Sequence, residues 1–246
     1  MNLSRIGVNE NSSSYMMPVV KCSGGTVLSL RAISIPPRNG QASQGLLIAL
    51  HGWGASAQDV AALADYLELP EFQMIFPDAP FPFPFGPDGR VWYNFPPNYT
   101  FTCEPSLAQQ PELVESRHML TEWVRSLSTS TGVPLEKTIL AGFSQGGAMT
   151  MEVGLTLPLA GLIVLSGYLH SPVQPLDSPP PVFMVHGRQD SVVPLQSAQT
   201  SRDMLQDLGV SVTYQELEGG HEISLRVLQL VQNFTRQIFQ PSGGTA

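Results

Sequence analysis

The stretch "TILAGFSQGGAMTMEVGL", residues 138–155, decides the fold. Its first part is a mostly apolar run, typical of a strand buried on both faces, and its second part is helix-like. Ser144 lies between them, with Gly142 two residues before it and Gly146 two residues after it. The pattern G-x-S-x-G alone is weak evidence, because this chain holds 22 glycines and many serines. The preceding strand and the following helix, however, predict a tight turn that exposes a nucleophilic serine.

Similar strand-like and helix-like segments alternate along the rest of the chain. Strands are expected at 45–52, 72–80, 137–144, 160–167, 180–187 and 210–217. Helices are expected at 56–69, 111–129, 145–157, 194–209 and 221–239. Apolar strands that alternate with helices indicate a mostly parallel sheet with helices on both faces. The sequence therefore predicts an α/β fold.

The N-terminal part of the chain has a different pattern. The segments "VVKCSG" (19–24) and "TVLSLRAISIPP" (26–37) flank a glycine turn, which predicts an antiparallel hairpin at the edge of the sheet. The polar ends, 1–14 and 241–246, are expected to be flexible. Since no repeat or linker interrupts the remainder, a single domain is expected over 15–240.

Composition and charge argue against several classes of partner. The chain is 42% hydrophobic and 13% charged, with a net charge of −8 and no basic cluster, so nucleic acid is not expected to bind. No apolar window approaches the roughly 18 residues of a transmembrane segment, and no signal-peptide core is visible. Cys22 and Cys103 are read as two thiols in preference to one disulfide. These observations predict a cytoplasmic protein.

A nucleophilic serine needs a base, and the base needs an acid that orients it. Asp190 follows the expected strand at 180–187, and His221 lies in a glycine-rich loop before the last helix. Both follow Ser144 in the chain order that accompanies such a turn. Glu216 and Glu218 are the rival acids.

The other histidines and aspartates fit different roles. His118 is expected on a helix surface, and His170 follows a strand, where it could line the site. His186 is expected to hold the loop that carries Asp190. Asp177 lies in a proline-rich linker, and Asp203 and Asp207, on an expected helix, read as solvated.

An acyl-transfer site also needs hydrogen-bond donors for the oxyanion. The residue after the nucleophile supplies one backbone N–H, here that of Gln145. The loop "HGWGAS" (51–56) follows an earlier strand, and its Trp53 N–H is the candidate second donor. His51 and Gly52 would shape that turn.

The segment 79–106 is rich in proline and aromatic residues and is expected to be irregular. It reads either as a loop that packs its own rings or as a lid or wall over an apolar pocket. The expected pocket residues are Phe81, Phe83, Phe85, Trp92, Tyr93, Phe95 and Tyr168. The same loop suits contact with a second copy of the chain or with a lipid surface.

Taken together, these motifs resemble the carboxylesterase/phospholipase branch of the α/β-hydrolases, which includes acyl-protein thioesterases. The matching motifs are "LHGWGAS", "FPDAP", "VWYNF", "ESRHMLTEWV", "GFSQGGAM", "LSGYL", "FMVHGRQDSVVP" and "GGHEI". They run in family order from about residue 45 to 240. The resemblance implies an α/β-hydrolase fold, a triad of Ser144, Asp190 and His221, and oxyanion donors at Trp53 and Gln145.

We therefore expect a serine carboxylesterase that forms an acyl-enzyme and needs neither metal nor organic cofactor. Carboxylic esters of short to medium chain are the expected substrates, with acyl thioesters and lysophospholipids as alternatives. The competing hypothesis is a non-catalytic binding protein on a hydrolase scaffold.

Overall fold

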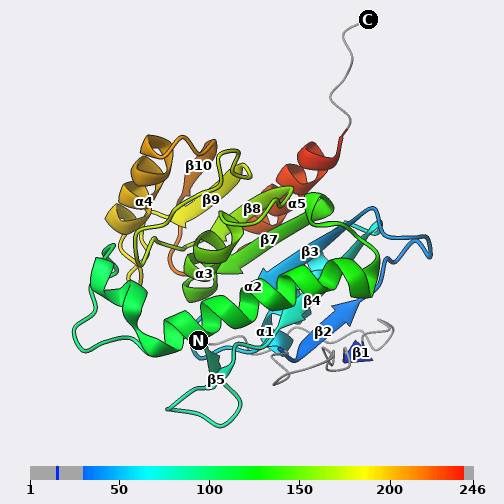
Figure 1. Cartoon of the computed structure of the whole chain (residues 1–246). Coiled ribbons are helices and arrows are strands. Elements are labelled where there is room, and N and C mark those ends of the chain that lie inside the picture. The colour runs from blue at the N-terminus through cyan, green and yellow to red at the C-terminus, as the bar shows by residue number, and fades with distance from the viewer. Residues whose placement is uncertain (1–14, 17–29, 241–246) are drawn as a thin grey trace, which may run out of the picture.

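The structure is a computed structural model that describes residues 15–16 and 30–240 (Figure 1). Its central sheet has eight strands in the order β1-β2-β4-β3-β7-β8-β9-β10. They are β1 (Tyr15–Met16), β2 (Ala32–Ile35), β3 (Gly45–Leu50), β4 (Phe72–Pro77), β7 (Thr138–Phe143), β8 (Gly161–Leu165), β9 (Val182–Gly187) and β10 (Val212–Leu217). All neighbours from β4 to β10 are parallel, whereas β2 pairs antiparallel with β1 and β4.

The predicted mostly parallel sheet with an N-terminal antiparallel pair is confirmed. The register pairs Tyr15 with Ser34, so this pair joins β1 and β2. The expected glycine turn between 19 and 37 lies largely outside the described residues, as do both ends expected to be flexible, 1–14 and 241–246.

Helices cover both faces of the sheet (Figure 1). They are α1 (Ala57–Ala61), α2 (Pro111–Thr131), α3 (Gln145–Gly154), α4 (Leu195–Asp207) and α5 (Leu225–Phe239), with 3₁₀ turns η1 (Ala62–Tyr66), η2 (Pro105–Gln109) and η3 (Leu135–Lys137). Residues of α2, α3 and α4 share one apolar core, and residues of α1 and α5 share the other. In β3, Leu46 and Ile48 enter the first core and Leu47 the second. This alternation is the two-residue period of a strand buried on both faces.

Two helix boundaries differ from the sequence-based expectation, each for a local reason. The helix expected at 56–69 is α1 followed by the 3₁₀ turn η1, and Leu67 is already extended. Pro70 disfavours helical backbone at Leu69, the residue before it, so the helix does not resume before β4. The last helix begins after Ser224, whose Oγ accepts the N–H of Val227, and this places His221 in a loop.

The segment 79–106 is more regular than expected. Strands β5 (Phe81–Pro82) and β6 (Arg90–Val91) form a short antiparallel ladder, which the N–H of Phe83 extends by binding the carbonyl of Gly89 at 2.9 Å. The expectation of an irregular segment is therefore wrong at its base. A proline can sit in such an isolated edge ladder because it lacks only the donor N–H.

Among the residues that the structure describes, no helix combines the length and apolar character that crossing a membrane requires.

Candidate active site

Ser144 occupies the predicted turn between β7 and α3. Its φ of 56° and ψ of −118° lie in a region that residues with a side chain rarely adopt, and its carbonyl accepts the first helical bond from Ala148. A Cβ on Gly142 would lie 2.2 Å from the carbonyl oxygen of Gly146, and one on Gly146 would lie 2.5 Å from that of Leu50. The predicted requirement for glycine at both positions is therefore confirmed.

Asp190 and His221 are brought together by the loops that follow β9 and β10. The His221 Nδ1 lies 2.7 Å from the Asp190 Oδ2, while Oδ1 of the same carboxylate accepts the N–H groups of Val192 and Val193 at 2.9 and 2.8 Å. The carboxylate is fully buried. With an ionised carboxylate as acceptor, Nδ1 carries the proton, so Nε2 is left as the basic nitrogen of the ring.

The environment of Asp190 keeps it ionised. Burial alone would raise the pKa of Asp190, but the hydrogen bonds from His221 and from two backbone N–H groups outweigh burial and lower it below its ordinary value. A negative charge is thus held beside the imidazole over the whole range near neutrality. This arrangement favours a charged imidazolium when the ring takes a proton.

The rival acids Glu216 and Glu218 do not contact His221. Glu216 and Glu218 bind Arg188, each at 3.0 Å, at the surface end of β10. His118 and Asp177 are exposed, as are the two aspartates predicted to be solvated, Asp203 and Asp207. The structure therefore pairs His221 with Asp190 alone among the candidate acids.

His186 supports the loop that carries Asp190, as predicted. Its Nε2 lies 2.9 Å from the carbonyl of Val193 and 3.4 Å from the Asp190 Oδ2. Burial lowers the pKa of His186, so the ring is neutral and donates its Nε2–H to that carbonyl. His186 therefore positions the acid and is not the base.

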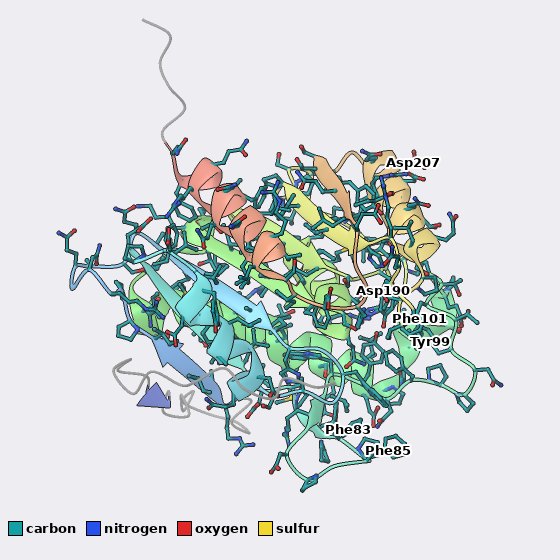
Figure 2. All side chains as sticks on the ribbon, turned by 180° about the vertical axis from the view of Figure 1, so that it is seen from behind. Phe83, Phe85, Tyr99, Phe101, Asp190 and Asp207 are labelled. Carbon is teal, nitrogen blue, oxygen red and sulfur yellow. The ribbon has the colours of Figure 1, made fainter. Side chains whose placement is uncertain are left out.

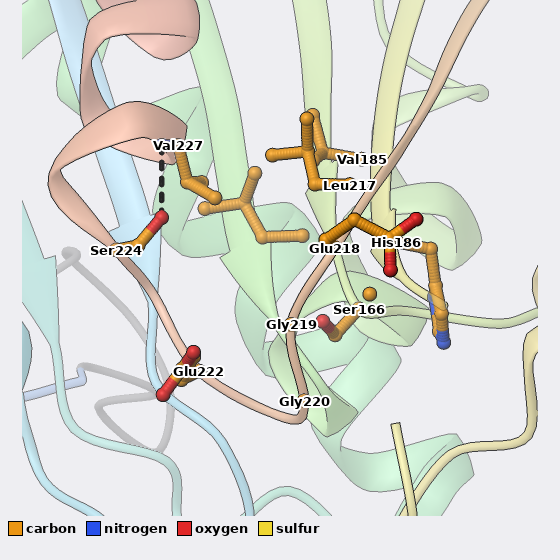
Figure 3. Close-up of a pocket in the computed structure, with 12 residues that line it drawn as sticks. Ser166, Val185, His186, Leu217, Glu218, Gly219, Gly220, Glu222, Ser224 and Val227 are labelled. Carbon is orange, nitrogen blue, oxygen red and sulfur yellow. Dashed lines mark hydrogen bonds between the residues drawn. The ribbon is translucent and has the colours of Figure 1, made fainter. Parts of the chain in front are cut away.

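A small cavity lies under the loop that carries His221 (Figure 3). Its volume of about 20 Å³ has room for about one water molecule. Its lining comes from Leu165, Ser166, Val185, His186, the segment 217–220, Glu222, Ser224 and Val227. Neither Ser144 nor Trp53 belongs to this lining, so this cavity is distinct from the expected acyl pocket.

The predicted oxyanion donors both lie in segments joined to the serine turn. A Cβ on Gly52 would lie 3.4 Å from the Cβ of Ser144, which places the turn before Trp53 against the nucleophile. Within the described part of the chain, neither the Trp53 N–H nor the Gln145 N–H has a hydrogen-bond acceptor. Both donors are therefore free to bind an oxyanion.

The turn at 51–56 is held in place by its neighbours. The buried ring of His51 accepts the N–H of Ala79 through Nε2 at 3.0 Å and binds the Gly52 carbonyl through Nδ1 at 2.8 Å. Arg90 of β6 exchanges backbone hydrogen bonds with Gly54 and Ala55. The base of the aromatic segment is thus tied to the oxyanion turn by main-chain bonds.

Gln145 has a second role that its position in the motif did not reveal. Its buried side chain accepts the N–H of Trp92 at 3.0 Å and donates to the carbonyl of Tyr93 at 2.7 Å. The residue after the nucleophile therefore clamps the aromatic segment to the start of α3. No local sequence signal identifies these partners, because they lie more than 50 positions away in the chain.

This clamp predicts that Gln145→Ala destabilises the fold. The substitution leaves two buried backbone groups without partners, so we expect a loss of about 2 to 3 kcal/mol in the free energy of unfolding. Urea unfolding measures it. Gln189→Ala, which removes only an exposed hydrogen bond at 3.3 Å, is the matched control and should cost less than about 0.5 kcal/mol. Equal losses in the two variants would contradict the clamp.

The predicted pocket residues differ in burial: Trp92, Tyr93 and Tyr168 are fully buried, and Phe85 is exposed. Figure 2 labels Phe83 and Phe85 at the hairpin and Tyr99 and Phe101 further along the same segment. The ring of Trp53 contacts those of Phe83 and Phe95, with 4.7 and 5.6 Å between ring centroids. The ring of Phe95 also contacts those of Tyr99 and Phe101. Phe95, Tyr99 and Phe101 pack against a small buried cluster that includes Ala148, one helical turn from Ser144. We call Trp53, Phe83, Phe95, Tyr99 and Phe101 the aromatic wall.

Not every predicted pocket residue belongs to the aromatic wall. Trp92 is fully buried in the core beside α2, and its indole N–H binds the His51 carbonyl at 3.1 Å, so its expected place in the pocket is wrong. Tyr93 and Tyr168 are also fully buried and lie behind the wall. Phe85 is 77% exposed at the tip of the hairpin. Phe81 lies on β5, apart from these ring contacts.

Sequence reasoning also missed a buried polar chain behind the wall. Tyr93, His170 and Glu152 are linked by hydrogen bonds, and all three are buried. A signal was available, because Glu152 is the only charged residue in 138–155. A charge in an otherwise apolar helix indicates buried partners.

Comparisons with known proteins show the family and the fold of this chain. The family model described as Phospholipase/Carboxylesterase matches residues 35–239. The crystal structure of esterase PE8 superposes with a TM-score of 0.75 at 30% identity, covering 83% of this chain and 97% of that one.

Two curated relatives are both described as acyl-protein thioesterases. "Acyl-protein thioesterase 1" of Neurospora crassa is 36% identical over 115 residues, 42% of this chain and 47% of the relative. "Acyl-protein thioesterase 1 homolog 2" of Dictyostelium discoideum is 27% identical over 68% of this chain and 76% of the relative. The chain thus spans about half the length of the Neurospora protein.

Proposed function

Because the chain belongs to the phospholipase/carboxylesterase family, we propose that it is a serine esterase with Ser144 as nucleophile, His221 as base and Asp190 as orienting acid. The observation that carries the proposal is the 2.7 Å contact between His221 Nδ1 and the buried Asp190 carboxylate, in a chain whose strained Ser144 begins a helix. A folded binding protein would have no need of this costly arrangement.

The reaction follows from these positions. Ser144 Oγ attacks the ester carbonyl carbon while His221 Nε2 takes its proton, and the oxyanion is bound by the N–H groups of Trp53 and Gln145. His221 then gives the proton to the leaving alcohol, and an acyl-enzyme remains. A water molecule, deprotonated by His221, attacks the acyl carbon, and His221 then gives that proton to Ser144 Oγ as the acyl–Oγ bond breaks and the acid is released. The aromatic wall is placed to contact the acyl group.

Carboxylic esters of short to medium chain are the substrates that we propose, with acyl thioesters and lysophospholipids as alternatives. Support comes from the apolar character of the aromatic wall and from the thioesterase names of the relatives.

The test is hydrolysis of nitrophenyl esters of graded acyl length, together with labelling by a fluorophosphonate reagent and mass spectrometry. We expect turnover and a single adduct on Ser144. A protein that hydrolyses none of these esters and takes no label would instead be a non-catalytic binding protein. A rate independent of acyl length would contradict the proposed contact between the aromatic wall and the acyl group.

We also propose that the exposed hairpin tip touches a lipid surface, with a second copy of the chain as the alternative. Phe85 is 77% exposed yet lies 6.1 Å from the Trp53 ring, so an apolar contact would form beside the site. Phe85→Ala should weaken co-sedimentation with neutral phosphatidylcholine vesicles roughly tenfold. Val114→Ala, an exposed apolar control on α2, should not. A concentration-dependent dimer that Phe85→Ala abolishes would favour the second copy.

A cytoplasmic location remains a proposal. Among the residues that the structure describes, Cys103 forms no disulfide, which is compatible with a reducing compartment. Cell fractionation would test it, and recovery outside the cytoplasm would contradict it.

A further inference from the structure

A chain of buried hydrogen bonds runs from α3 to the back of the aromatic wall. The Glu152 Oε2 lies 2.9 Å from Nε2 of His170, and Nδ1 of His170 lies 2.9 Å from the Tyr93 hydroxyl. The Tyr93 hydroxyl in turn lies 3.3 Å from that of Tyr168. The catalytic mechanism uses none of these groups.

The Glu152 carboxylate at one end of this chain is held ionised. Arg117 binds the Glu152 carboxylate at 2.5 Å, and Ser171 donates to it at 3.1 Å. Burial would raise the pKa of Glu152, but the hydrogen bond from His170 and the charges of His170 and Arg117 outweigh burial and lower it. An ionised Glu152 accepts from His170 Nε2–H, which fixes the orientation of the His170 ring and leaves its Nδ1 facing the Tyr93 hydroxyl.

Tyr93 is therefore held at two points. Its hydroxyl is bound by His170, and its backbone carbonyl accepts the Gln145 side chain at 2.7 Å. Its ring meets Phe95 edge-on at 5.6 Å, and Phe95 lies 5.6 Å from Trp53. Tyr93 thus supports one ring of the aromatic wall, Phe95, directly and a second, Trp53, through it.

We propose that Glu152 and His170 are positioning residues that, through Tyr93, hold the aromatic wall where it binds the acyl chain of the substrate. The inference rests on the proposed esterase function and deepens it. Apolar residues could fill the same space without the cost of burying a carboxylate. Hydrogen bonds are directional, whereas apolar packing is not, so the hydrogen bonds to Tyr93 hold its ring in a single orientation.

The test compares KM for nitrophenyl acetate with KM for the longest nitrophenyl ester that the wild type hydrolyses. Tyr93→Phe keeps the ring and removes its bond to His170, and Glu152→Gln removes the charge that orients His170. In both, the ratio of the long-ester KM to the acetate KM should rise about fivefold, the effect of about one hydrogen bond. Tyr214→Phe removes a buried hydroxyl on β10 that has no partner among the described residues, and should leave the ratio unchanged.

A double variant separates positioning from general stability. If Tyr93 transmits the effect of Glu152, then Glu152→Gln combined with Tyr93→Phe should change the KM ratio no more than the larger single change. Independent, multiplicative effects would overturn the inference. So would a fall in activity that is the same for both esters and follows the melting temperature. If Glu152→Gln fails to fold, His170→Asn takes its place in the cycle.

Failure of the inference can be told apart from failure of the proposed function. If the wild type hydrolyses nitrophenyl acetate and Ser144 takes the fluorophosphonate label, but the KM ratios do not move, the positioning role alone is wrong. If the wild type hydrolyses no ester, the esterase proposal and the inference are both wrong.

Discussion

Ser144→Ala is expected to lower kcat/KM for nitrophenyl esters by about 10⁴-fold or more, because no other described group stands at the turn to form the acyl-enzyme. The Ser144→Ala variant should also take no fluorophosphonate label. Circular dichroism should be unchanged, since alanine replaces only the hydroxyl. Hydrolysis that persists at the wild-type rate in the variant would contradict the role of Ser144 as nucleophile.

Ser144→Gly gives a companion test of the same site through stability. Its φ of 56° strains any residue that has a Cβ, and glycine removes that strain. We expect the free energy of unfolding to rise by about 1 kcal/mol while activity is lost, a combination that thermal unfolding and the ester assay measure together. Ser191→Gly, at an exposed position where no positive φ is found, should not be stabilised. An inactive variant that is also less stable would argue against strain at the turn.

Asp190→Asn is expected to lower kcat by about 10⁴-fold, because an amide no longer selects the His221 tautomer that keeps Nε2 free to take a proton. The amide must also replace a carboxylate that accepts two backbone N–H groups. Steady-state kinetics on one ester is sufficient to measure the loss.

The matched controls for Asp190→Asn are the two rival acids. Glu216→Gln and Glu218→Gln change carboxylates that bind Arg188 at the surface, so kcat should stay within about twofold of the wild type. A loss in either control comparable with that in Asp190→Asn would reassign the orienting acid.

The α/β architecture was predictable because each strand and helix carries its own signal. The run 138–143 is apolar at nearly every position, as a strand buried on both faces must be, and a glycine pair around Ser144 marks the turn. The first helix was predicted less well, since its switch to 3₁₀ geometry in η1 and the extended backbone at Leu67 have no distinct signal in the residue pattern. The ladder between β5 and β6 was missed because proline density suppresses the usual strand signal.

Chain order and residue type were enough to find the turn at Ser144 and to choose Asp190 and His221 as candidates. Both are local properties, read from strand ends and glycine-rich loops. Chain order and residue type could not reveal that the Gln145 side chain clamps the backbone of the aromatic segment. They also could not reveal that Glu152 is linked to Tyr93 through His170. These contacts join residues 18 to 77 positions apart. They exist because packing on the sheet leaves buried polar groups that must find partners wherever the fold brings them.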